Sequence, residues 1–256
     1  MNFNNFFTYN ENKELHFSLP TKTFITIMGE GKNRLLKNLL FEKKHEYISL
    51  MFTKITAKNI LNYKKNVMFI LHKHLNIFIG ETVNDEIAFG MESLGINRSE
   101  MKNIIENYAK SFNIIHLLNK DPNCLGTSDK AKVKLISALV CKPKVLILDE
   151  ILCEIDKYEI KIVLNNLKKF VEEENIIMNF TNDVNETLYG DEIIVLNDEK
   201  ILISGKTLNV LNEDKIMKKL GLGLPFVIEL NKYLIDYEII NKYQLDIERL
   251  VDEIWK

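Results

Sequence analysis

The amino-acid sequence predicts an α/β protein with a helical insertion near residues 82–140 and a helical extension after about residue 206. Short apolar segments, typical of strands buried on both faces, recur along the chain with helical patterns between them. The clearest of these strands, residues 145–150, runs straight into the carboxylates of Asp149 and Glu150. Open α/β sheets bind ligands at this end of a strand, although a solvated acidic turn would produce the same pattern.

Length and charge exclude several classes of protein. The chain has 256 residues and a net charge of −2, so it lacks the basic surface that binds nucleic acid or an anionic bilayer. Its apolar runs are shorter than the roughly 20 residues that span a membrane, and residues 1–5 do not resemble a signal peptide. The three cysteines lack CxxC spacing, which fits free thiols in a reducing cytosol.

The first third of the chain predicts strands around one helix. Residues 1–9 alternate and are rich in Phe, which predicts a strand that ends in the exposed aromatic Tyr9. Residues 21–28 predict a strand that leads directly into Gly29 and a helix with four leucines on one face. Further strands are predicted at residues 47–55 and 66–71.

The middle of the chain predicts three successive helices. Thr82 begins a capping box and a short helix through Phe89, Asn97 caps the next helix, and Ser128 with Asp129 opens the third. After the acidic strand, the pattern predicts a helix near 157–173, strands at 175–180, 191–196 and 200–204, and a helical tail to Lys256.

A strand, a glycine-rich turn ending in lysine, a helix and a distant apolar strand ending in Asp-Glu describe a P-loop NTPase. In such a protein, backbone amides at the helix N-terminus hold phosphate oxygens and Lys32 reaches the β- and γ-phosphates. Asp149 would hold Mg²⁺, and Glu150 would activate the attacking water as general base. ATP and Mg²⁺ are therefore the predicted cofactors. The alternative for Lys32 is a solvated lysine in the first helical turn.

Longer segments resemble the ATP-binding subunits of ABC transporters, specifically those of energy-coupling factor (ECF) importers. The resemblance covers nearly the whole chain. It rests on a segment after the Q-loop, the Walker B strand, the closing strands and two pieces of the C-terminal extension: residues 79–90, 141–150, 193–201, 222–226 and 248–253.

This resemblance implies a RecA-like α/β core with an antiparallel β region and a helical subdomain at about 72–140, all within an ATPase domain of residues 1–220. A C-terminal helical extension, 221–256, follows it. The family works as head-to-tail dimers, so the implied partners are a second ABC ATPase subunit, with a heterodimer favoured, and the membrane scaffold and substrate-binding subunits of an ECF transporter. The implied location is the cytoplasmic face of the cell membrane, and the implied cargo is a vitamin or a transition-metal ion.

The phosphate-binding loop departs from the family pattern Gly-x-x-Gly-x-Gly-Lys-Ser/Thr-Ser/Thr. Only Gly29, Glu30 and Gly31 separate the strand from Lys32, which leaves the loop about three residues, or roughly 10 Å, short. Asn33 replaces the Mg²⁺-binding hydroxyl and is followed by Arg34. An amide oxygen can ligate a hard cation, so Asn33 and Asp149 remain candidate metal ligands.

Other positions that contact the nucleotide in this family also differ. His72 stands at the position of the Q-loop glutamine, and Asn182 at that of the switch histidine. In the signature segment 125–129, Gly126 precedes Ser128, the predicted N-cap, and Asp129, whose carboxylate would repel the partner's γ-phosphate.

Three aromatic or imidazole side chains have alternative interpretations. Tyr9 is a candidate for stacking on adenine, with a core aromatic as the alternative. His72 and His74 could suggest a metal site, but surface histidines at the end of a strand are favoured because no third ligand lies nearby in the sequence.

We therefore predict the ATP-binding subunit of an ECF-type importer whose own hydrolysis is weak or absent. The alternative is a non-catalytic structural or regulatory subunit that keeps the dimer and membrane-docking surfaces.

Overall fold

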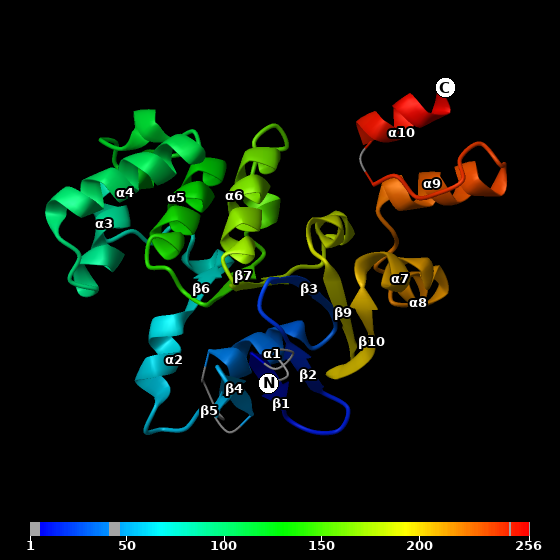
Figure 1. The fold of residues 1–256 in the computed structure, drawn as a ribbon, viewed down its shortest axis with the longest axis horizontal. Helices are drawn as coiled ribbons and strands as arrows, with labels where there is room; N and C mark the ends of the chain where they lie inside the picture. Colours follow the sequence, from blue (N-terminus) through cyan, green and yellow to red (C-terminus); the bar gives the residue numbers. More distant parts are fainter. Residues whose placement is uncertain (1–5, 41–46, 246, 256) are drawn as a thin grey trace.

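The computed structural model describes residues 6–40, 47–245 and 247–255, and it confirms the α/β fold (Figure 1). Its centre is a six-stranded sheet in the order β10-β9-β3-β8-β7-β6, in which only β10 runs antiparallel to its neighbour. The strands are β3 (Thr23–Gly29), β6 (Val67–Leu71), β7 (Val145–Asp149), β8 (Ile176–Phe180), β9 (Glu192–Asn197) and β10 (Lys200–Lys206).

The predicted central strands are confirmed, and their burial explains their sequence. The first four residues of β7 are buried, as is every residue of β8, because each strand has a neighbour on both sides and layers on both faces. Asp149 pairs with Leu71 of β6 and with Phe180 of β8. The parallel strands thus deliver the residues that follow them to one edge of the sheet.

Successive residues of each strand point into two different cores. Leu146 and Leu148 face a core formed with α3 (Val83–Ser93), α4 (Arg98–Ser111), α5 (Thr127–Leu139) and α6 (Ile160–Glu172). Val145 and Ile147 face a second core that contains α1 (Lys32–Leu39) and the small antiparallel sheet. Helices α3 to α5 form the predicted helical insertion at one end of the molecule (Figure 1). Single-turn helices are η2 (His72–His74), η3 (Ile115–Leu117), η4 (Pro122–Cys124) and η5 (Leu152–Glu154); η6 (Val184–Tyr189) is longer.

The antiparallel sheet has the order β2-β1-β4-β5. In this part of the chain the structure corrects one predicted strand and adds two elements. The single strand predicted at 47–55 is a hairpin, because Met51 and Phe52 turn the chain with φ angles of 49° and 62°. Neither β2 nor helix α2 was predicted, since β2 is only four residues long and α2 is polar, with Tyr63 its one buried residue. Residues 1–5 of the predicted first strand lie outside the described residues. The elements are β1 (Phe7–Asn10), β2 (His16–Leu19), β4 (Ile48–Leu50), β5 (Thr53–Lys54) and α2 (Ile60–Asn66).

The predicted helical tail is four helices at the end opposite the insertion: α7 (Thr207–Asn212), α8 (Asp214–Lys219), α9 (Phe226–Asp236) and α10 (Ile247–Ile254) (Figure 1). They share a third core with Met28, Ile193 and Val195 of the large sheet. The boundary at residues 220 and 221 stays a prediction, and Lys256 lies outside the described part. Within that part, no helix is both long and apolar enough to cross a membrane.

Candidate functional site

The carboxyl ends of β3, β7 and β8 bring together residues that the sequence singled out. Lys32 follows the turn after β3, Asp149 ends β7 and is followed by Glu150, and Asn182 comes two residues after β8. Contacts between side chains of these segments confirm that they converge. These strand ends therefore lie together at one side of the sheet.

Lys32 and Glu150 form an ion pair at the centre of this group. The Lys32 ammonium lies 2.6 Å from Oε1 of Glu150, and the two side chains are 7% and 32% exposed. The hydroxyl of Thr181 donates a hydrogen bond of 3.2 Å to the other oxygen, Oε2. The alternative of a solvated first-turn lysine is wrong, because Lys32 is buried against the predicted general base.

Asp149 is half buried behind this pair. Its burial raises the pKa of the carboxyl, as does the neighbouring Glu150, while the charge of Lys32 acts in the opposite direction. Asn33, the second candidate metal ligand, has an exposed side chain on α1.

The turn between β3 and α1 is closely packed against backbone. Gly29 and Gly31 have φ angles of 94° and 96°, and a Cβ on Gly29 would lie 2.1 Å from the carbonyl oxygen of Leu196. A Cβ on Gly31 would lie 2.7 Å from Cα of Glu199. Both glycines are needed because the end of β9 and the following turn occupy the space beside them.

Asn182 contacts this turn directly. Its side-chain oxygen accepts a hydrogen bond of 3.2 Å from the backbone N–H of Gly29. The position of the switch histidine is thus filled by a side chain that uses one backbone donor of the phosphate-binding turn.

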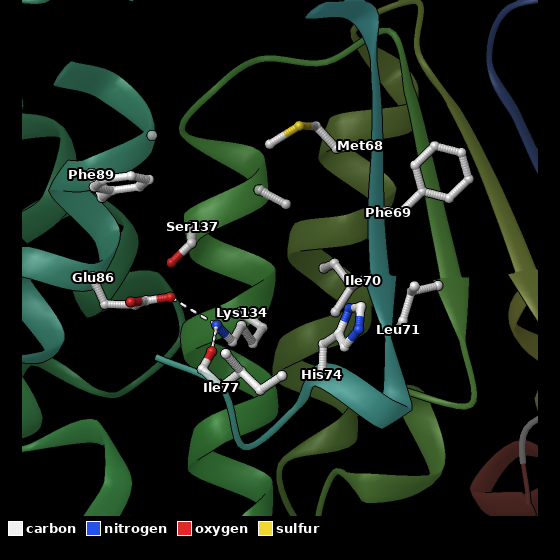
Figure 2. A pocket seen from close by; sticks show the side chains of 12 residues that line it. Met68, Phe69, Ile70, Leu71, His74, Ile77, Glu86, Phe89, Lys134 and Ser137 are labelled. Atoms are coloured by element: carbon white, nitrogen blue, oxygen red, sulfur yellow. Dashed lines mark hydrogen bonds and ion pairs between the residues drawn. The ribbon is translucent and has the colours of Figure 1, made fainter. Parts of the chain in front are cut away.

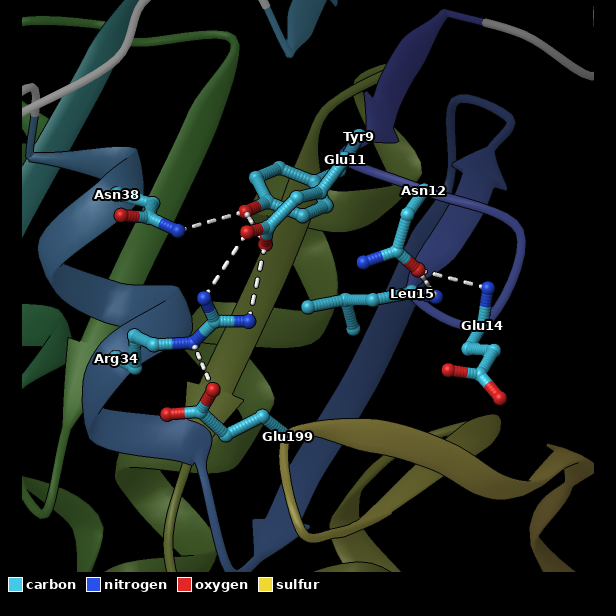
Figure 3. A network of polar contacts seen from close by, with 8 residues as sticks. All are labelled: Tyr9, Glu11, Asn12, Glu14, Leu15, Arg34, Asn38 and Glu199. Carbon is cyan, nitrogen blue, oxygen red and sulfur yellow. Dashed lines mark hydrogen bonds and ion pairs between the residues drawn. The ribbon is translucent and has the colours of Figure 1, made fainter.

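Arg34 joins three segments through two carboxylates (Figure 3). Its Nη1 and Nη2 atoms donate to the two oxygens of Glu11 at 3.0 and 3.2 Å. Its Nε lies 2.8 Å from Oε2 of Glu199 in the turn between β9 and β10. This arrangement, which we call the Arg34 clamp (Arg34, Glu11 and Glu199), ties α1 to both turns and neutralises the arginine.

Tyr9 is fully buried, so the predicted exposed aromatic is wrong. Its ring stacks on Phe17 with centroids 5.6 Å apart, and its hydroxyl donates to Glu11 and accepts from Asn38, both at 2.9 Å. Burial raises the pKa of its hydroxyl. The ring is a core aromatic because alternation along β1 turns residue 9 toward the same core as Phe7.

His72 directly follows β6, at the edge of the sheet beside β7. Its Nε2 atom lies 2.9 Å from Oε1 of Glu154, and its side chain is 53% exposed. The imidazole is therefore a surface group paired with the segment that follows Glu150.

The predicted signature residues lie in a separate polar cluster at the start of α5. The helix is capped by Gly126, so the prediction of Ser128 as N-cap is wrong. The Ser128 hydroxyl instead donates to Glu159 and accepts from the backbone N–H of Asp156, both at 3.1 Å. It is satisfied by the segment that precedes α6.

Lys132 neutralises the carboxylates of this cluster. Its side chain is 2% exposed, and its ammonium lies 2.8 Å from Glu159 and 2.7 Å from Asp129. The carboxylate of Asp129 is thus paired within the chain. The start of α5 thus has two carboxylates beside it, Asp129 of its own first turn and Glu159 at the start of α6, and one buried cation. This arrangement does not attract an incoming phosphate.

An apolar groove of about 410 Å³ lies between β6, α3 and α5 (Figure 2). Ile77 and Phe89 line it with side chains that are 58% and 52% exposed. Lys134 holds two sides of the groove together: its ammonium donates to Oε1 of Glu86 at 2.8 Å and to the carbonyl of Ile77 at 2.5 Å. We call this contact the Lys134–Glu86 brace. Glu86 in turn accepts from the backbone N–H of Ile79 at 2.8 Å.

Sequence reasoning missed the partners that satisfy these groups: Glu11, Glu199, Lys132, Glu159 and Thr181. One local signal was available, since a lysine at position 132 interrupts the apolar face of α5 three residues after Asp129. The clamp carboxylates carry no such signal, because both lie in polar turns far from Arg34 in sequence.

The residues present do not fit a nucleotide held in the usual way. The turn is too short to wrap a phosphate, backbone lies within 3 Å of a Cβ built on Gly31, and Arg34 is neutralised by two carboxylates. Asp149, Glu150 and Lys32 have the right chemistry for Mg²⁺-ATP, but Lys32 and Glu150 are paired with each other.

Comparison with known proteins assigns the family. The model described as "ABC transporter" matches residues 12–152, more than half of the chain. The energy-coupling factor transporter ATP-binding protein EcfA of Pediococcus pentosaceus is 30% identical over 88% of this chain and 80% of its own length. EcfA1 of Mycoplasma pneumoniae is 27% identical over 98% of this chain and 94% of its own length.

The fold comparison agrees. The structure of CbiO1 from Clostridium perfringens, described as part of an ABC transporter complex, superposes with a TM-score of 0.71 over 90% of this chain and 99% of that chain, at 22% identity. Sequence and fold together show that this chain belongs to the ABC transporter family of ATP-binding proteins.

Proposed function

We propose that this chain is an ATP-binding-type subunit of an ECF importer, peripheral on the cytoplasmic side of the membrane, whose own nucleotide site is weakened. It pairs with a second, more regular ABC ATPase subunit, which supplies most of the hydrolysis that drives uptake of a vitamin or a transition-metal ion. The ATPase domain spans residues 1–220 and the helical extension 221–256. The names of the relatives support the assembly, since they are ATP-binding subunits of energy-coupling factor transporters.

The ion pair between Lys32 and Glu150 is the main observation in favour of weakened hydrolysis by this chain. A lysine that holds phosphates and a glutamate that activates water must be available to different atoms of the bound substrate. Here each is the other's partner at 2.6 Å, beside a turn that lacks the length to hold a phosphate. The family's catalytic residues remain in the chain, but they neutralise one another.

The apolar groove supports docking to a membrane partner. Its walls present exposed Ile77, in the turn after η2, and exposed Phe89, on α3, and the Lys134–Glu86 brace links these two segments through the Ile77 carbonyl and Glu86. A helix with an apolar face fits such a groove between a sheet edge and two helices. We assign this groove to the membrane scaffold.

The second candidate is a non-catalytic subunit, and the Arg34 clamp favours it. Two carboxylates hold Arg34 at the start of α1, where the family binds phosphates, and the same clamp draws the turn at Glu199 toward Gly31. A subunit of this kind would keep the dimer and docking surfaces without binding nucleotide.

Reconstitution with the partner ATPase and the membrane subunits tests the proposal. Glu150→Gln in this chain is expected to lower the ATPase rate of the complex by less than about twofold, whereas the same change in the partner's glutamate abolishes it. Equal losses from both changes would refute the weakened site. Complete insensitivity to Glu150→Gln, with no nucleotide bound by this chain, would select the non-catalytic candidate.

Docking is tested in the same system. Phe89→Asp in the groove is expected to abolish co-purification with the membrane subunits. Phe52→Asp is the matched control, because Phe52 is similarly exposed, at 59%, but lies in the hairpin between β4 and β5. Assembly that survives Phe89→Asp would exclude the groove as the docking surface.

A further inference from the structure

A buried acidic side chain, Glu186, lies close enough to Glu150 of the ion pair for their charges to interact. Glu186 belongs to η6 and is 1% exposed. Its Oε2 atom accepts a hydrogen bond of 2.6 Å from the side-chain amide of Asn179, which is fully buried on β8. A carboxylate at this depth needs a compensating charge or a proton.

Two oxygens of this contact have no hydrogen-bond partner within the described structure: Oδ1 of Asn179 and Oε1 of Glu186. Both are acceptors if Glu186 is ionised, and two buried acceptors cannot satisfy each other. A proton on Oε1 changes that atom into a donor. An amide and a carboxylic acid can then form two hydrogen bonds in one ring, and the two orphaned oxygens are the pair that the second bond joins.

The same proton affects the neighbouring hydroxyl. Thr181 donates to Glu150, accepts from the backbone N–H of Asp183 and also lies within hydrogen-bonding reach of Glu186. A hydroxyl has a single proton to donate. If Glu186 were ionised, it would compete with Glu150 for that proton, whereas a neutral Glu186 leaves it to Glu150.

The surroundings of Glu186 favour the neutral form. Asp183 on its own segment and Glu150 after β7 are both acidic, and Cys153 and Tyr189 also lie close enough to interact. Burial, followed by the charges of Asp183 and Glu150, raises the pKa of Glu186 to about 7, against the opposing hydrogen bonds from Asn179 and Thr181. The β3 neighbour in register with Asn179 is Thr26, which adds a hydroxyl and no charge.

We propose that Glu186 is held as a neutral carboxylic acid paired with the Asn179 amide, and that it is a positioning residue for Glu150 through the shared hydroxyl of Thr181. Ionisation of Glu186 breaks the pair with Asn179 and places a second carboxylate next to the Thr181 proton. The hydrogen bond from Thr181 to Glu150 therefore depends on pH. This dependence is a property of the isolated chain, whether or not nucleotide binds.

Infrared spectroscopy of the isolated chain tests the protonation directly. The carbonyl-stretch band of a protonated carboxylic acid is expected at a pH of about 6 and disappears with a midpoint near the raised pKa of Glu186. Glu186→Gln is expected to lose the band, because glutamine has no carboxyl group, while Glu81→Gln, an exposed surface change, keeps it. A wild-type spectrum without the acid band would overturn the proposal even if the Gln variant failed to fold.

Unfolding by urea supplies the second readout. A group whose pKa is higher in the folded protein binds more protons when folded, so stability falls as pH rises from about 4.5 toward about 7. Glu186→Gln is expected to remove this fall, because the amide keeps one donor and one acceptor toward Asn179 at every pH. An unchanged pH dependence in the Gln variant would contradict a neutral Glu186.

A double-mutant cycle separates positioning from bulk stability. Glu150→Gln and Glu186→Gln are expected to be coupled. The unfolding equilibrium constant of the double variant should differ by more than about twofold from the value that the two single variants predict, and this difference should change with pH. Additive effects at every pH would show that Glu186 only fills space and does not act on Glu150.

Discussion

The ammonium of Lys32 and the carboxylate of Glu150 lie 2.6 Å apart although 117 residues separate them in the sequence. The strands that precede these two residues, β3 and β7, are not adjacent, since β8 lies between them. The two side chains therefore meet above the end of β8, where Thr181 completes the contact. Residues expected to handle different parts of a substrate are here bound to each other.

Replacing Lys32 by Met is expected to destabilise the protein by about 2 kcal/mol, because it leaves the Glu150 charge without its partner. The loss is smaller than for a fully buried pair, since Glu150 is 32% exposed and water compensates in part. Adding Glu150→Gln to the Lys32→Met variant should recover part of the stability.

Urea unfolding measures these changes, and Lys37→Met is the matched control because Lys37 is exposed on the same helix. Equal losses from Lys32→Met and Lys37→Met would show that the ion pair contributes nothing to folding.

Lys132→Met is expected to cost about 3 kcal/mol, because it leaves Glu159 and Asp129 facing each other without a cation. Lys102→Met, an exposed change on α4, should remain within about 0.5 kcal/mol of the wild type. The measurement is the urea concentration at the midpoint of unfolding, compared between variants whose unfolding free energies depend equally on urea concentration. If both lysines proved equally dispensable, the cluster at the start of α5 would not be a structural network.

Replacement by alanine should affect stability very differently at Gly29 and Gly126. Gly29→Ala is expected to cost about 3 kcal/mol or more, since φ is 94° and the new Cβ would lie 2.1 Å from the carbonyl oxygen of Leu196. Gly126→Ala should stay within about 1 kcal/mol, because a Cβ there meets no atom within 4 Å. Thermal unfolding of both variants provides the comparison, and a Gly29→Ala protein as stable as Gly126→Ala would be evidence against the packed turn.

The sequence predicted the parts of the fold that follow from local pattern. The apolar run ending at Asp149 was predicted as a strand buried on both faces, which β7 confirms, and the capping box at Thr82 marks the start of α3 in the structure. A parallel sheet then places the carboxyl ends of its strands on one side, so no other sequence signal is needed to bring these residues together. The hairpin at Met51 and Phe52 was missed because neither residue is typical of a turn with positive φ.

Pairing between distant side chains could not be predicted in the same way. Tyr9 looked exposed because it ends a short strand, yet its core neighbour Phe17 lies on β2, which the sequence did not predict. The partners of Arg34 come from two turns, near residues 11 and 199, that meet only after both sheets have formed. The sequence showed which residues depart from the family pattern, but only the structure shows what those residues contact.

Equilibrium titration of the isolated chain with ATP and Mg²⁺ is the most direct test of the weakened site. A turn without room for a phosphate, together with the paired Lys32 and Glu150, predicts weak binding or none, and no turnover above background. Micromolar binding, accompanied by turnover that disappears in Glu150→Gln, would contradict it.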